Sequence, residues 1–188
     1  MRKVALITDG WRRLFTYAWP AGILQRIRET GEDVNLYIFN STGNWSRDAG
    51  YNRAEYNIYN LPELSDFDGI ILELNNISSP AVLADVISNA KRSGRPVVSI
   101  ANELGDFYYV GIDNYSAMKQ VIAHLHEVHD CKKFWLLVGA QDNYESSCRL
   151  QGMLDYAKEH KIKIDKDDIW YGSFDYKSGL EGYKHLCD

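Results

Sequence analysis

Short apolar runs recur along this chain of 188 residues, and segments with helical spacing separate them. The runs are continuous rather than alternating, and each has the length of a strand. Strands that are apolar on both faces belong to a sheet covered on both sides, which is typical of parallel sheets in α/β proteins. The runs cover residues 4–7, 34–39, 69–74, 97–100, 108–112 and 134–138.

Residues at the ends of the intervening segments mark helix boundaries. Ser79 offers an N-cap, Pro80 suits the first helical position, and Gly94 suits a C-terminal stop. Asn114 is expected to cap the next helix. Strand and helix therefore alternate, and this order predicts a doubly wound α/β fold with a parallel sheet and right-handed crossovers.

The two halves of the chain differ in how many strands they supply. We expect an α/β lobe over residues 1–130 and a partial second lobe over residues 131–188, with strands at 133–138 and 169–172. Two parallel strands make a poor sheet whose open edges invite pairing. The second lobe is therefore expected to be incomplete or completed by another copy, and we expect a homodimer.

Composition narrows the class of protein. A formal charge of −5 and a pI of about 5.5 argue against direct nucleic-acid contact, which needs clustered Lys and Arg. No apolar run approaches the length that spans a bilayer, and no secretion signal follows Met1. Three widely spaced cysteines fit a reducing compartment. The expected location is the cytoplasm.

Several stretches resemble, in order and spacing, the effector-binding domain of the LacI/GalR regulators. The similarity covers most of residues 67–186, and its pieces are FDGIIL at 67–72, GRPVV at 94–98, VGIDN at 110–114, RLQG at 149–152 and GSF at 172–174. The resemblance implies a two-lobed fold of the type I periplasmic-binding-protein kind. It also implies a small-molecule effector closed between the lobes, closure transmitted to an output domain, and no cofactor.

Four residues are candidate ligands for the effector. The resemblance places Arg149 where the family binds ligand, and a guanidinium fork suits vicinal hydroxyls or a carboxylate; the alternative is a surface arginine. It also places Phe174 against the ligand, with a core phenylalanine as the alternative. Asp9 and Asp113 follow strand ends, the side where open α/β sheets bind ligands, although Asp113 could equally cap a helix.

The segment after the first strand is unusually aromatic. Trp11 and Phe15, with Tyr17 and Trp19, could form a stacking wall for a sugar, or equally a core or dimer patch. Similar openings occur in repressor-like sensor halves of diguanylate cyclases. No helix-turn-helix headpiece precedes the first strand, so DNA binding is not expected within this chain, and the output is either a transcriptional headpiece or a cyclase.

Catalytic and metal-binding patterns are weak. The sequence has no dinucleotide fingerprint and no Walker-type phosphate loop. His124, His126 and His129 do not predict a metal site, because residues 124 and 126 point to different helix faces. We therefore expect a non-catalytic sensor that acts by lobe closure. The alternative is a doubly wound enzyme acting on a sugar or phosphorylated metabolite.

Overall fold

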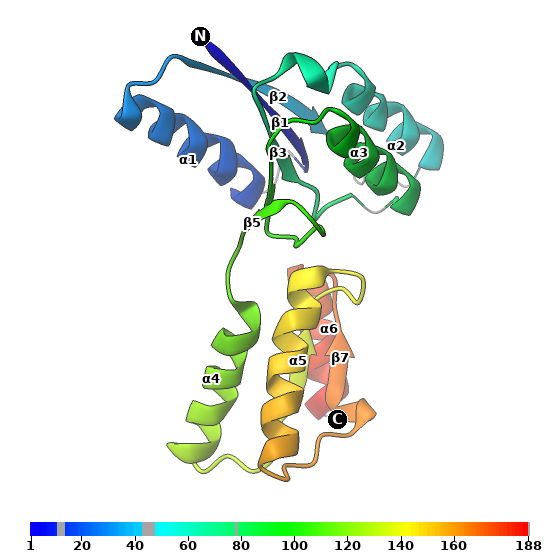
Figure 1. The fold of residues 1–188 in the computed structure, drawn as a ribbon. Coiled ribbons are helices and arrows are strands. Elements are labelled where there is room, and N and C mark those ends of the chain that lie inside the picture. The colour runs from blue at the N-terminus through cyan, green and yellow to red at the C-terminus, as the bar shows by residue number, and fades with distance from the viewer. Residues whose placement is uncertain (11–13, 43–47, 78, 188) are drawn as a thin grey trace. The chain divides into compact units, whose positions relative to one another are not determined.

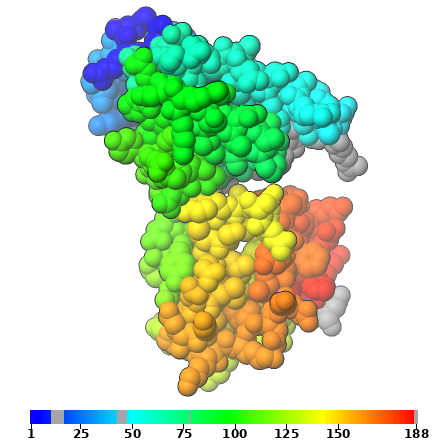
Figure 2. Space-filling model, turned by 45° about the vertical axis from the view of Figure 1, so that its right-hand side comes forward, coloured from blue at the N-terminus to red at the C-terminus, as the bar shows by residue number. Residues whose placement is uncertain are grey.

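The chain forms two compact units, Met1–Gly111 and Ile112–Asp188 (Figure 1). The computed structural model describes residues 1–10, 14–42, 48–77 and 79–187. The division falls earlier than the expected boundary after residue 130. The reason is that helix α4 (Asn114–Glu127) packs along α5 (Tyr144–Glu159), as Figures 1 and 2 show, and so belongs with the second unit.

The first unit is built on a five-stranded parallel sheet in the order β2-β1-β3-β4-β5. Every pair of neighbouring strands is parallel, as the apolar runs predicted. The register aligns Leu6 with Ile71 and Thr8 with Glu73, so that β1 and β3 end side by side. The strands are β1 (Arg2–Asp9), β2 (Val34–Ser41), β3 (Gly69–Glu73), β4 (Val97–Ile100) and β5 (Tyr108–Val110).

Helices cover both faces of this sheet, so the fold is doubly wound. Helix α1 (Leu14–Thr30) lies on one face, and α2 (Ala49–Glu55) and α3 (Pro80–Arg92) lie on the other (Figure 1). Short 3-10 turns at Tyr56–Asn60 and Leu64–Asp66 join α2 to β3.

The predicted ends of α3 are confirmed. The Ser79 hydroxyl accepts from the Val82 backbone N–H at 3.5 Å, and Pro80 begins the helix. Gly94 follows with a φ of +66°, a left-handed conformation that favours glycine.

The buried core cluster of the first unit lies between the sheet, α3 and the segment that joins α2 to β3. Alternate residues of β1 and β3 point into it, as the two-residue period of a strand requires. They meet apolar residues of α3 and aromatic rings of the segment between α2 and β3. The buried members are Ala5, Ile7, Tyr56, Tyr59, Leu64, Phe67, Ile70, Leu72, Leu74, Ile77, Val86, Ala90 and Val97.

The second unit has a sheet of only two parallel strands, β6 (Leu136–Val138) and β7 (Ile169–Tyr171). One face of the sheet contributes Leu136 to a core with α4 and α5. On the opposite face, α6 (Tyr176–Cys187) brings Gly182 so close that a Cβ there would lie 2.3 Å from the Trp170 ring. A 3-10 turn at Lys166–Asp168 precedes β7.

Helices α4 and α5 approach each other closely at Gly152. A Cβ at this position would lie 2.3 Å from the Tyr115 carbonyl oxygen. Two polar contacts flank the crossing: the Tyr115 hydroxyl donates to Asp155 at 3.0 Å, and the Lys119 ammonium lies 2.8 Å from the Glu159 carboxylate. The glycine therefore sets the distance between the helices.

No helix in the part of the chain that the structure describes is long and apolar enough to cross a membrane.

Candidate functional site

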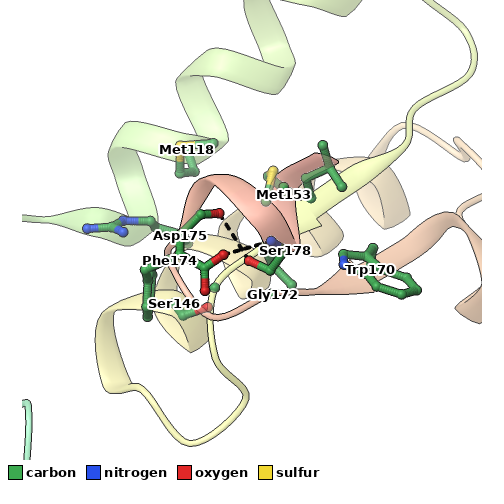
Figure 3. Close-up of a pocket in the computed structure, with 13 residues that line it drawn as sticks. Met118, Ser146, Met153, Trp170, Gly172, Phe174, Asp175 and Ser178 are labelled. Atoms are coloured by element: carbon green, nitrogen blue, oxygen red, sulfur yellow. Dashed lines mark hydrogen bonds between the residues drawn. The ribbon is translucent and has the colours of Figure 1, made fainter. Parts of the chain in front are cut away.

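A cavity of about 290 Å³ opens in the second unit at the carboxyl ends of β6 and β7 (Figure 3). This is the end of an open α/β sheet at which ligands bind. Its volume is near the lower limit for small-molecule pockets, which begin at roughly 300 Å³. It is lined by Met118, Leu137, Val138, Gly139, Ser146, Arg149, Met153, Trp170, Gly172, Phe174, Asp175, Ser178 and Gly179.

Arg149 reaches this cavity from α5 and is held in place by two neighbours. Its Nε donates to the Asn114 side-chain oxygen at 2.7 Å, and its Nη2 lies 3.8 Å from the Glu145 carboxylate. The Asn114 amide in turn donates to Glu145 at 3.2 Å. The guanidinium is therefore oriented before any ligand arrives, which lowers the entropy cost of forming further hydrogen bonds.

Phe174 presents an exposed aromatic ring to the same cavity (Figure 3). Its side chain is 54% exposed, so the alternative interpretation, a phenylalanine buried in the core, is wrong. Its backbone has a φ of +60°, a left-handed conformation that is strained for a bulky residue. The ring lies directly over Gly139, where a Cβ would approach it to 2.1 Å. Only glycine allows this position of the ring.

Asp175 and Ser178, which sequence reasoning did not select, complete one wall of the cavity. The Asp175 carboxylate accepts from the Ser173 hydroxyl at 2.6 Å and from the Ser178 backbone N–H at 2.7 Å. These hydrogen bonds hold the pKa of Asp175 below its ordinary value, and the bond from the Ser173 hydroxyl has the largest effect. An aspartate immediately before a helix is a capping signal that the sequence did contain.

Asp113 is the N-cap of α4. Its carboxylate accepts from the Ser116 backbone N–H at 2.9 Å, and this bond holds the pKa of Asp113 below its ordinary value. The expectation that Asn114 is the cap was wrong, because Asn114 is the first residue of the helix and its buried side chain contacts Arg149. Contact of Asp113 with an effector stays a prediction.

Asp9 lies in the first unit and is fully buried at the carboxyl end of β1. Its neighbour Thr8 donates to the buried Glu73 carboxylate at 2.8 Å. The Tyr59 hydroxyl donates to the Thr8 carbonyl at 2.9 Å. Burial raises the pKa of Tyr59 far above its usual range, and the negative charge of Asp9 raises it further. The sheet order reverses between β1 and β3, a switch point where α/β sheets bind ligands.

The remaining predicted ligands are only partly described. Trp11 lies outside the described residues, as does the side chain of Phe15, whose backbone belongs to α1.

Of the predicted ligands, Arg149 and Phe174 line one cavity, and Asp113 lies next to Asn114, the asparagine that holds the arginine.

Comparisons with known proteins bear on the fold. No family model matches the chain. Over 134 residues, or 71% of its length, the chain is 31% identical to catabolite control protein A of Staphylococcus xylosus and spans 39% of that protein. A sugar-binding LacI-family regulator from Escherichia coli, solved with phosphate, aligns over 98% of this chain and 63% of its own, with a TM-score of 0.71 and 19% identity. The chain has the fold of LacI-family transcriptional regulators.

A second solved structure of this fold, the transcriptional regulator CelR in complex with cellobiose, aligns over 99% of the chain with a TM-score of 0.68 and 23% identity. The chain spans 55% of CelR, so it corresponds to part of a regulator of that size. The LacI-family fold confirms the predicted parallel α/β class, and the partial coverage fits an incomplete second lobe. None of the three proteins is described as a diguanylate cyclase, and that output stays a prediction.

Proposed function

We propose that this chain is the effector-sensing region of a LacI-family regulator and that its second unit binds a small, polyhydroxylated, sugar-like molecule. The observation that carries the proposal is that Arg149 and Phe174 line one cavity at the carboxyl ends of β6 and β7.

The two side chains suit different parts of such a molecule. Arg149 is fixed by Asn114 and Glu145, and a fixed guanidinium fork can bind two neighbouring hydroxyl groups. The exposed Phe174 ring offers an apolar surface for the C–H face of a sugar ring. The names of two proteins with this fold add support: one is described as sugar-binding, and CelR was solved with cellobiose.

The proposed action is regulation without chemical change. An effector that binds one conformation more tightly than another shifts the equilibrium between them, by as much as the difference in binding free energy. We assign the regulator to the cytoplasm and expect it to act as a homodimer. We expect the effector to control an output domain of the whole regulator, either a transcriptional headpiece or a cyclase.

A thermal-shift screen with mono- and disaccharides, including cellobiose, tests the proposal. An effector at about 100 times its Kd should stabilise the chain by about 2.7 kcal/mol. Arg149→Lys and Phe174→Ala should each remove most of this stabilisation. Two control variants, Arg26→Ala and Tyr108→Ala, change exposed residues of the first unit and should leave it intact.

The recovered ligand separates the sensor from the alternative enzyme. Mass spectrometry should find it unchanged after long incubation with the chain. Conversion of a stabilising sugar or sugar phosphate would favour the enzyme instead. A stabilising ligand whose effect survives both cavity substitutions would contradict the assignment of this cavity.

A further inference from the structure

Four of the five histidines in the chain gather where α4 ends and α5 ends. His124 and His126 lie in the last turns of α4, His129 follows that helix, and His160 follows α5. The rings of His126 and His160 are 5.6 Å apart, and those of His124 and His129 are 4.8 Å apart. The proposed effector cavity does not include any of them.

His124 and His129 point their Nε2 atoms toward each other, 3.1 Å apart. Both side chains are exposed. The backbone after α4 produces this approach: the Val128 N–H donates to the His124 carbonyl, and Asp130 takes a left-handed φ of +52°. The chain thus turns back on the helix, which brings together two residues whose spacing in the sequence did not suggest a pair.

The two rings have a geometry that suits a shared metal ion. An ion about 2.05 Å from each Nε2 would be held at an N–metal–N angle of about 100°, between square-planar and tetrahedral geometry. Rings aimed at that ion would have centroids about 4.8 Å apart, which is the observed separation. A straight N–H···N hydrogen bond would instead separate the centroids by about 5.4 Å.

The neighbouring histidine has a different role. His126 Nδ1 lies 3.0 Å from the Tyr156 hydroxyl, which itself donates to the Glu127 carboxylate at 3.0 Å. Because the Tyr156 hydroxyl donates its proton to Glu127, His126 Nδ1 must donate to the tyrosine oxygen, and this nitrogen cannot bind a metal ion.

Among the described residues, no group of three or more His, Cys, Asp or Glu side chains is placed to hold a metal.

We propose that His124 and His129 chelate one borderline divalent metal ion, such as Zn²⁺, Ni²⁺ or Cu²⁺, with water in the other coordination positions. Imidazole nitrogen suits these ions and suits the hard cation Mg²⁺ poorly. Two exposed ligands make an exchangeable site rather than a buried structural one. A bound ion would link the last turn of α4 to the turn that follows it.

Isothermal titration calorimetry of the full chain with Zn²⁺ and with Ni²⁺ tests this site. We expect one ion per chain, and an affinity at least about tenfold weaker in His124→Gln and in His129→Gln, because each substitution leaves a single ligand. Matched controls are His185→Gln, at the remaining histidine on α6, and Cys131→Ser, at the thiol whose sulfur lies 4.0 Å from the His129 carbonyl oxygen. Both controls should bind as the native chain does.

Three outcomes would overturn the proposal. One is native-like binding by His124→Gln or His129→Gln. Another is loss of binding in Cys131→Ser, which would assign the ion to the thiolate. The third is equal binding of Mg²⁺. Circular dichroism of each variant checks that the helices are retained, and both histidines are exposed enough for glutamine to be tolerated.

Discussion

Replacing Gly152 with alanine should destabilise the second unit although alanine is the better helix former. In the interior of α5 the exchange favours the helix by about 1 kcal/mol. The new Cβ, however, would lie 2.3 Å from the Tyr115 carbonyl oxygen, 3.1 Å from its carbonyl carbon and 3.3 Å from the Lys119 backbone nitrogen. Since carbon and oxygen usually approach only to about 3.3 Å, α4 and α5 must separate by about 1 Å.

The cost of that separation exceeds the gain. Overpacking of a tight contact costs about 1–3 kcal/mol, and the contacts from Tyr115 to Asp155 and from Lys119 to Glu159 would lengthen as well. We expect a net loss of about 1–2 kcal/mol.

Hydrogen–deuterium exchange of the α4 and α5 amides in the full chain measures this loss for the second unit alone. The matched control is Gly179→Ala in α6, where a Cβ would have no atom within 4 Å. That variant should be stabilised by about 0.5–1 kcal/mol. A Gly152→Ala chain that is as stable as the native chain, or more stable, would refute the packing argument.

Two further substitutions test buried and capping carboxylates. Thr8→Val removes a donor from the buried Glu73 carboxylate and should lower the free energy of unfolding, measured by urea denaturation, by about 1–3 kcal/mol. The control Thr30→Val, at the exposed end of α1, should change it by less than about 0.5 kcal/mol. Equal effects of the two substitutions would contradict the reasoning. Because the folded pKa of Asp175 lies below its ordinary value of 3.8, its stabilisation is present above that value and is lost as the pH falls through the folded pKa. The difference in Tm between the native chain and Asp175→Asn should therefore stay constant at higher pH and narrow as the pH falls below 3.8, and a difference that stays constant there would argue against the cap.

The sheet could be predicted because burial on both faces leaves a direct signal in the sequence. Residues 4–7 are a continuous apolar run within β1, and residues 69–74 are apolar except for Glu73 and lie almost entirely in β3. Helix α1 left no comparable signal. Proline lies inside it at Pro20, and Tyr17 and Leu24 are exposed, so apolar residues do not mark one face.

The site was less predictable because it depends on contacts between elements. The resemblance pointed to Arg149 and Phe174, but the bond from Arg149 to Asn114 joins residues 35 positions apart and exists only because α4 and α5 pack together. The left-handed backbone of Phe174 could not be read from the sequence, since φ values above zero are expected chiefly at glycine. The same holds for Asp130, whose left-handed φ pairs His124 with His129.

Glycines at contact points give the second unit both its helix packing and its cavity. Gly152 lets α4 approach α5, and this approach places Asn114 within reach of Arg149. Gly139 leaves room for the Phe174 ring, and a Cβ at Gly172 would lie 2.9 Å from the Ser178 hydroxyl oxygen. A side chain at Gly139 or Gly172 would displace Phe174 or Ser178, and one at Gly152 would separate the two helices that bring Asn114 to Arg149. The geometry of the proposed effector site is therefore fixed as much by where side chains are absent as by the arginine and the aromatic ring that would bind the ligand.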